Sequence, residues 1–276
     1  DVFLLDRSTG NHKLVSHTAG SATQACNAAS TAGSISGDGA WVVFYSAATD
    51  LVAGVTDTNA QNDVFLFETA TGNVTLLSRS AASATTTANN FSHIAQISVD
   101  GRFVTFVSGA TDLITGQVDA NAQSDLFLHD RVTGITTLVS HVGASSVTTG
   151  NDYAVRSTIS EDSTIIAFTS KASDLISGGT DTNAAADLFC YEISSGNITL
   201  ASHAPGSTLT AASGTVGNAS GCAISADGKY VLFSHTGASL VAGQTDTNTV
   251  WDVFLYDRTT NTNRLVSHLP GSAIAA

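Results

Sequence analysis

The chain has 276 residues, 12% of them charged, and 23 acidic against 10 basic side chains give it a formal net charge of −13. This excess of negative charge excludes nucleic acids and anionic membrane surfaces as partners, because both are bound by faces rich in Lys and Arg. No run reaches the roughly 18 apolar residues of a membrane span, and frequent short apolar runs exclude a disordered chain. We therefore expect a folded domain that can bind cations.

Short apolar runs separated by turns predict β-strands along the whole chain. The Asp38-Gly39 and Thr71-Gly72 dipeptides are typical of hairpin turns. No segment of about ten or more residues shows a capped helical pattern, so we predict an all-β fold. Four strands are predicted in the first complete unit. The first ends at Ile35-Ser36, and the other three are Trp41–Tyr45, Val64–Phe67 and Val74–Ser78.

The third of these strands recurs at a nearly fixed interval. A second anchor, which reads SGDGAWVVFYS in its first copy, lies 27 residues upstream of every copy except the first. Such periodicity indicates supersecondary units that stack on one another. Because the second and third strands are apolar at consecutive positions, both faces of each sheet must be covered, as in the antiparallel blades of a β-propeller. The third strands start 62 residues apart, and 65 for the last interval, at Asp1, Asp63, Asp125, Asp187 and Asp252.

The recurring pattern S-x-DG-x-x-V-x-F-x-S, followed by TDTN-x-x-x-DVFL-x-D-x-x-TG, resembles the TolB-type, WD40-like β-propeller repeats of bacterial extracytoplasmic proteins. The resemblance covers nearly the whole chain and is strongest to the subgroup with a DTN(G)xxDVF loop. It implies a secreted, extracellular or cell-surface protein, with the periplasm as the alternative. The chain departs from that subgroup after DTN, where the common Gly is replaced by Ala60, Ala122, Ala184 and Thr249.

We predict a single β-propeller domain over residues 1–276. It would consist of a half-blade at 1–17 and blades at about 18–80, 81–142, 143–204 and 205–269, with five or more blades in the complete ring. The half-blade lacks its first two strands, and the residues after Leu269 are too few to supply them. An unpaired sheet edge tends to recruit another strand. We therefore expect completion either by a longer polypeptide or by another subunit in a homo-oligomer or filament.

Each complete blade also carries an acidic loop just before its third strand. Asp, Asn and Asp stand at offsets 0, 2 and 6, and this spacing of oxygen ligands suits Ca²⁺. The four sets are Asp57, Asn59 and Asp63; Asp119, Asn121 and Asp125; Asp181, Asn183 and Asp187; and Asp246, Asn248 and Asp252. Three sets have a further acid seven residues upstream that could complete the coordination, namely Asp50, Asp112 and Asp174. The fourth set has Ser239 at that position, so we expect its site to be the weakest.

Two other interpretations of the acidic loops must be considered. An EF-hand is excluded, because its sixth loop position must be Gly, whereas the four loops have Asn62, Ser124, Ala186 and Trp251 there. The second interpretation is that Asp and Asn only cap turns, since their side chains bond nearby backbone N–H groups. The cation hypothesis rests on the close carboxylates, which repel each other unless a cation or hydrogen-bond donors compensate, and no Lys or Arg lies within the loops.

The cysteines and histidines give weaker signals. Cys26, Cys190 and Cys222 have no zinc-ligand spacing. We expect buried, small apolar side chains, with a disulfide between Cys26 and Cys222 as an open alternative. A histidine also recurs after the fourth strand, and we interpret it as a repeated surface residue too widely spaced to share a metal. The residues at this position are His17, Arg79, His141, His203 and His268.

None of the common catalytic motifs is present, so we predict no catalytic residue. Because propellers host many unrelated activities, the fold alone does not decide the function. Our leading hypothesis is a secreted calcium-binding propeller that serves as a structural, adhesive or assembly module and could bind a glycan or a protein. One alternative is a propeller enzyme (a hydrolase or lyase) or the propeller partner of a peptidase, which should show a polar cluster that breaks the repeat. The other is a periplasmic, TolB-like interaction hub, which should show an exposed apolar or charged patch.

Overall fold

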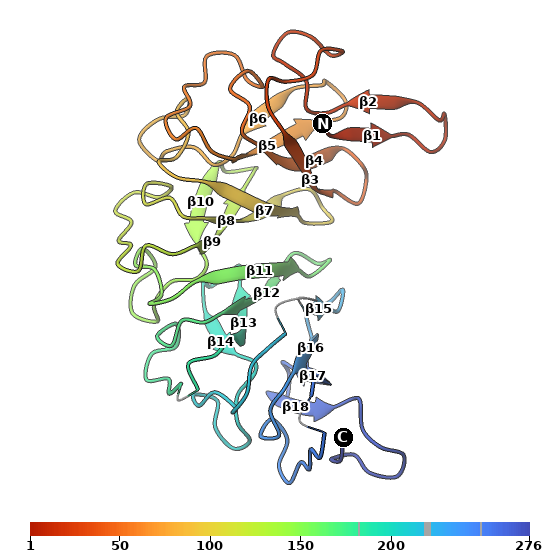
Figure 1. The fold of residues 1–276 in the computed structure, drawn as a ribbon, viewed down its shortest axis with the longest axis vertical. Coiled ribbons are helices and arrows are strands. Elements are labelled where there is room, and N and C mark those ends of the chain that lie inside the picture. The colour runs from red at the N-terminus through yellow and green to blue at the C-terminus, as the bar shows by residue number, and fades with distance from the viewer. Residues whose placement is uncertain (182, 218–221, 249) are drawn as a thin grey trace. The chain divides into compact units, whose positions relative to one another are not determined.

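The computed structural model describes residues 1–276 except 182, 218–221 and 249 (Figure 1). Within these residues the chain folds into β-strands and contains no helix, so no helix there is long and apolar enough to cross a membrane. The strands form one two-stranded and four four-stranded antiparallel sheets, in which neighbouring strands follow one another in sequence. This confirms the predicted all-β fold of four-stranded propeller blades.

The half-blade is the hairpin of β1 (Phe3–Leu5) and β2 (His12–Leu14). The complete blades are β3 (Ser30–Ile35), β4 (Trp41–Ser46), β5 (Asp63–Glu68) and β6 (Val74–Leu76); β7 (Ser92–Ile97), β8 (Phe103–Ser108), β9 (Asp125–Asp130) and β10 (Ile135–Leu138); β11 (Ala154–Ile159), β12 (Ile165–Ser170), β13 (Asp187–Glu192) and β14 (Ile198–Leu200); and β15 (Ala223–Ile224), β16 (Tyr230–His235), β17 (Asp252–Asp257) and β18 (Thr262–Leu265).

The fourth strand of the first complete blade ends earlier than predicted, at Leu76 instead of Ser78. The reason is local, because the backbone N–H groups of Leu77 and Ser78 both approach the carbonyl oxygen of Val64, at 2.8 and 3.4 Å. This shared acceptor interrupts the regular ladder. It also places the Ser78 hydroxyl group beside the start of β5, where it contributes to the acidic site.

The chain divides into two compact units. One unit comprises Asp1–Asp119 and Phe127–Leu138, and the other comprises Ala120–Leu126 and Val139–Ala276. In the first unit, β8 is buried at all six positions, as expected for a strand covered on both faces. In the second unit the same holds for β12.

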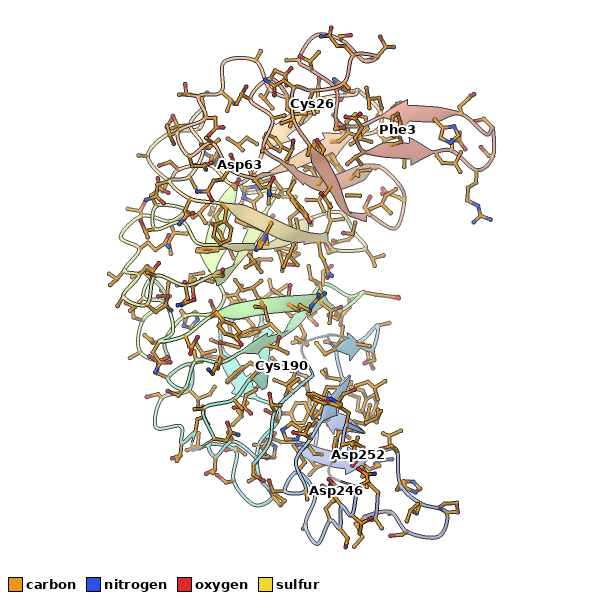
Figure 2. All side chains as sticks on the ribbon, viewed as in Figure 1. Phe3, Cys26, Asp63, Cys190, Asp246 and Asp252 are labelled. Carbon is orange, nitrogen blue, oxygen red and sulfur yellow. The ribbon has the colours of Figure 1, made fainter. Side chains whose placement is uncertain are left out.

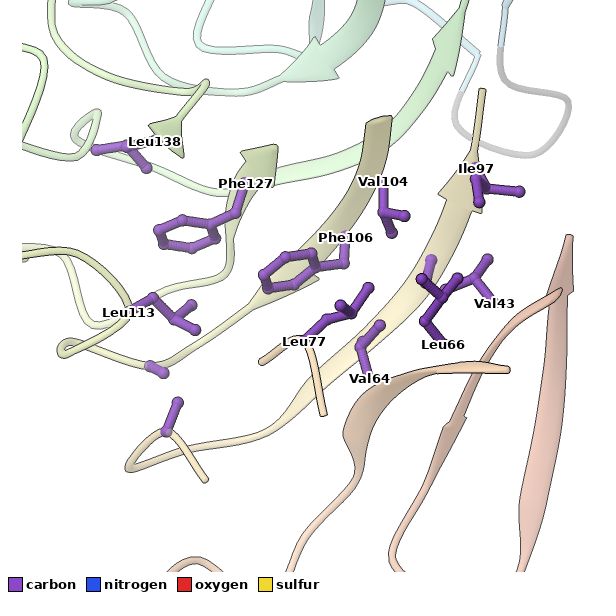
Figure 3. Packing of buried hydrophobic residues seen from close by; sticks show 13 residues of the cluster. Val43, Val64, Leu66, Leu77, Ile97, Val104, Phe106, Leu113, Phe127 and Leu138 are labelled. Carbon is purple, nitrogen blue, oxygen red and sulfur yellow. The ribbon is translucent and has the colours of Figure 1, made fainter. Parts of the chain in front are cut away.

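Apolar side chains from successive blades form the core of each unit. In the first unit, Val43 and Val64 pack in one cluster with Val104 and Phe106 of the next blade (Figure 3). Phe106 also stacks on Phe127 with ring centroids 5.8 Å apart. In the second unit the corresponding cluster joins residues of β12 and β13 to residues of β16 and β17. Burial of each such side chain contributes about 1.5–3 kcal/mol to folding, so the blades are held together mainly by apolar packing.

All three cysteines are free thiols. Cys190 is buried in the core of the second unit, as expected for a small apolar side chain, whereas Cys26 and Cys222 are only half-buried. Burial raises the pKa of its thiol to about 12. Cys190 is therefore a packing residue and not a nucleophile.

Candidate functional site

The acidic loop of the first complete blade starts with a turn that Asp57 caps. Its Oδ1 accepts hydrogen bonds from the backbone N–H groups of Asn59 and Ala60, both at 2.9 Å. Ala60 has a left-handed backbone with φ of 54°, and the equivalent Ala122 and Ala184 have φ of 53° and 51°. Gly adopts this conformation without steric cost, so the three alanines hold a backbone conformation that Gly would adopt more readily. Thr249, the fourth equivalent, lies outside the described residues.

Asn59 connects its loop to the segment that begins the next repeat. Its Nδ2 donates to the carbonyl oxygens of Ala88 at 2.7 Å and Asn90 at 3.2 Å. Its Oδ1 accepts the N–H of Gln61 at 2.6 Å. The same link recurs in the second unit, where Asn121 donates to Gly150 and Asn183 donates to Ala212. The middle residue of each of these three sets therefore joins two successive repeats.

Asp63, the first residue of β5, is the buried acid of the loop (labelled in Figure 2). The Ser78 hydroxyl donates to its Oδ1 at 3.0 Å and accepts the N–H of Val64 at 2.9 Å. Burial, and to a smaller extent the negative charge of Asp57, raise the pKa of Asp63 to about 7 against the opposing effect of Ser78. The first loop thus holds two nearby carboxylates, one of which ionises reluctantly.

The other blades repeat this arrangement of acid and serine. Ser140, Ser202 and Ser267 donate to the Oδ1 atoms of Asp125, Asp187 and Asp252 at 2.9, 2.7 and 2.8 Å. Burial and the charge of Asp181 raise the pKa of Asp187 to about 7 as well. At the turn of the fourth loop, the Oδ1 of Asp246 accepts the N–H of Asn248 at 3.0 Å. The first, third and fourth sets therefore share the capping of the turn by their first Asp, and all four sets share the bond from a serine to their last Asp.

The upstream acids Asp50, Asp112 and Asp174 accept hydrogen bonds from a different segment of the chain. Asp50 accepts the N–H of Asn27 at 2.9 Å, and Asp112 and Asp174 accept the N–H groups of Asn89 and Asn151 at the same distance. At the fourth position, the Ser239 hydroxyl accepts the N–H of Ser213 at 2.7 Å, so the serine keeps the role of the acid. These contacts give the upstream residues a structural role of their own.

The recurring histidines form a second set of links between blades. His17 Nε2 lies 3.0 Å from the carbonyl oxygen of Gly72, and Arg79 Nη2 donates to that of Gly134 at 3.0 Å. In the second unit His141 Nε2 lies 3.2 Å from the Gly196 carbonyl oxygen. The prediction of surface residues was wrong for His17 and His203, which are only 8% and 5% exposed, because the turn of the next blade covers this position. The sequence did contain a signal for this role, because every copy has a side chain with a nitrogen donor, His or Arg, at this position.

The described hydrogen bonds of the loop leave some oxygen atoms for a cation. The side-chain hydrogen bonds of Asp57 and Asp63 are all accepted by Oδ1. Within the described structure, the Oδ2 atom of each carboxylate therefore accepts no hydrogen bond. Across the described residues no cluster of three or more His, Cys, Asp or Glu side chains has the geometry to hold a metal. In this first loop, two carboxylate oxygens would suit Ca²⁺ together with backbone carbonyls and water, which commonly complete its coordination.

The sheets and their repetition define the chain as a β-propeller module. No family model matches it, and no curated protein matches it by sequence. It is similar to the structure of a protein described as TolB from Agrobacterium tumefaciens, with 17% identity over 84% of this chain and 62% of that one, at a TM-score of 0.44. The β-propeller domain of the Trilobed protease from Pyrococcus furiosus gives 9% identity over 87% and 57%, with a TM-score of 0.46. A similarity to the tricorn protease gives 13% identity over 95% and 24%, with a TM-score of 0.47. The chain therefore spans less than two thirds of each of these proteins.

Proposed function

We propose that this propeller module is a secreted structural or assembly module whose acidic loops bind Ca²⁺ next to the contacts between blades. The observation that carries the proposal is the pairing of a buried acid with a second acid in a loop that also joins two repeats. Asp57 and Asp63 form such a pair, and Asn59 between them donates to the next repeat. A cation bound there would stabilise the loop and the contact together.

The electrostatics of the buried pair favour a divalent cation. With its pKa raised to about 7, Asp63 is only partly ionised at neutral pH. A nearby positive charge favours the ionised form of a carboxylate, and bound Ca²⁺ would supply that charge to both acids. Asp57 and Asp63 would be the side-chain ligands, while Asn59 keeps the next segment in place. Asp181 and Asp187 would serve in the same way in the second unit.

The repetition of the links favours a scaffold over an enzyme. The amides of Asn59 and Asn183 donate to equivalent carbonyl groups, and so do the links from His17 and His141 to a glycine of the next turn. A single catalytic centre does not require such equivalence, whereas a stack of blades does. The extracytoplasmic location in the proposal rests on the resemblance of the repeats, and free Ca²⁺ is abundant enough outside cells to fill sites of modest affinity.

Isothermal titration of metal-free protein with CaCl₂ tests this proposal. We expect saturable binding to more than one site, and we expect Asp63→Asn to remove one of these sites. Asp6→Asn is the matched control, because Asp6 is an exposed acid that bonds only to its own turn. Binding that is absent in the wild type, or unchanged in the Asp63 variant, would contradict calcium binding at this loop.

A further inference from the structure

A cavity of about 540 Å³ lies in the first unit, between the blade of β3–β6 and the hairpin of β9 and β10. Trp41 of β4 and Arg79 after β6 line it from one blade, and His129 of β9 and Arg131 line it from the next. Its size is within the usual range for pockets that bind small molecules. All of its lining residues belong to the described first unit.

Two of these residues, Arg79 and His129, break the repeat. Trp41 does not, because its position holds a large side chain in every complete blade, with Phe103, Ile165 and Tyr230 in the others. Arg79 replaces the histidine of every other copy, and His129 replaces Leu5, Phe67, Tyr191 and Tyr256. Stacking of blades requires similar residues at equivalent positions. Two exceptions that meet at one cavity therefore point to a role beyond stacking.

The cavity concentrates positive charge in a strongly acidic chain. Two of the 10 basic side chains line it, whereas none of the lining residues is Asp or Glu. Arg131 lies over the Trp41 ring at 4.0 Å, and its Nε donates to the carbonyl oxygen of Gly101 at 2.8 Å. Arg79 makes a single hydrogen bond, to Gly134. Most N–H donors of both guanidinium groups are therefore available to a ligand.

The lowered pKa of His129 also indicates a positive electrostatic potential in the cavity. Burial, and then the charge of Arg79, lower its pKa to about 4, with Asp130 opposing the shift, so the imidazole is neutral at pH 7. Its Nδ1 lies 3.0 Å from the hydroxyl group of Thr136. A bound anion would offset the charge of Arg79, whereas a bound cation would add to it. The site thus favours a negatively charged ligand.

We propose that this cavity binds a small organic carboxylate with an apolar or ring-shaped body. The planar guanidinium group matches a carboxylate through paired hydrogen bonds. The remaining walls are largely apolar, with Leu66 and Val74 among them, and would contact the body of the ligand. This ligand site goes beyond the proposed scaffold role, and it does not depend on calcium binding by the acidic loops.

Benzoate is a suitable probe, with benzamide as its uncharged counterpart of similar shape. The chain has two tryptophans, so a Trp251→Phe background leaves Trp41 as the fluorescent reporter. We expect saturable binding of benzoate with a Kd of about 1 mM or lower, and binding of benzamide at least about tenfold weaker. Arg79→Gln and Arg131→Gln should each weaken benzoate binding by about tenfold or more.

Two variants separate ligand binding from folding. Arg258 is the counterpart of Arg131 in the last blade and donates to the carbonyl oxygen of Gly228, so Arg258→Gln should leave benzoate binding unchanged. Arg79→His restores the residue of the other copies and should keep the melting temperature while weakening binding at about pH 8, where imidazole is neutral. No binding of benzoate, equal binding of benzamide, or an equal loss in Arg258→Gln would overturn the proposal. Competition by inorganic phosphate with higher affinity than benzoate would overturn the carboxylate assignment.

Discussion

The buried acids of the loops should make the metal-free protein less stable as the pH rises. A carboxyl group whose pKa is higher in the folded state takes up protons on folding. Its contribution to the free energy of unfolding is therefore fully present below the pKa of the unfolded state. That contribution is lost as the pH rises through the folded pKa. For Asp63 the window runs from the ordinary value of 3.8 to about 7. Asp187 has the same window in the second unit.

The magnitude follows from the two pKa values. Between pH 5 and pH 8 one such carboxyl group changes the free energy of unfolding by about 2.5 kcal/mol. Because the side chain of Asp63 is only 2% exposed, solvent screening reduces this figure little. Asp63→Asn removes the titration and should reduce the loss of stability over this pH interval by that amount. The comparison should be made in EDTA, since Ca²⁺ would stabilise the ionised pair.

Urea unfolding of wild type and Asp63→Asn at both pH values measures the effect. The difference between the two proteins is the useful quantity, because buried histidines titrate with the opposite sign. Burial and nearby groups lower the pKa values of His129 and His235 to about 4, so their contribution is lost as the pH falls from about 6.5 towards 4. The same pH dependence in both proteins would refute the assignment of a raised pKa to Asp63.

Three further substitutions test the fold. Ala60→Gly should raise the free energy of unfolding by about 0.5–1 kcal/mol, because the backbone strain removed at φ of 54° outweighs the entropy that Gly adds to the unfolded chain. Ala82 has no such strain, so Ala82→Gly should lower the free energy of unfolding. Phe106→Ala should cost about 3–5 kcal/mol, since its ring is fully buried; a cost below about 1 kcal/mol would contradict the packing between blades. His17→Ala should cost about 1–2 kcal/mol through loss of the contact to Gly72, and the exposed His268 provides the control. Urea unfolding measures all three, and equal costs at His17 and His268 would argue against the link.

The fold was predictable from the sequence because local signals recur in register. The DG and TG turns and the apolar runs set the strands of each blade, and their fixed period indicates stacking. The left-handed conformation shared by Ala60, Ala122 and Ala184 follows from the same repetition. The bulge in β3 between Ala32 and Ser34 was not predicted, although Gly33 lies between these residues and an isolated Gly within a strand often indicates a bulge.

The contacts of the acidic loops were less predictable. The spacing of Asp57, Asn59 and Asp63 indicated a common site but not the direction of each side chain. The backbone N–H groups of the turn supply part of the compensation that the carboxylates need. The partner of Asn59, Ala88, lies 29 residues away. Such a contact depends on how two repeats pack, which no local pattern specifies.

The cavity illustrates the same limit. Arg79 and His129 depart from the repeat at two different positions, and Trp41 belongs to a third position, which varies from blade to blade. Only the packing of β9 beside the preceding blade brings them to one cavity. Their common feature is visible in the sequence only once the strands have been placed. Exceptions to a repeat are therefore best interpreted together and in three dimensions.

A crystal structure grown with CaCl₂, with anomalous scattering measured at long wavelength, is the sharpest test of calcium binding by the acidic loops. We expect an anomalous peak bound by Asp57 and Asp63, a second one bound by Asp181 and Asp187, and a weaker one or none at Asp246 and Asp252. Well-ordered loops with the described hydrogen bonds and no peak at any of these acids would contradict it.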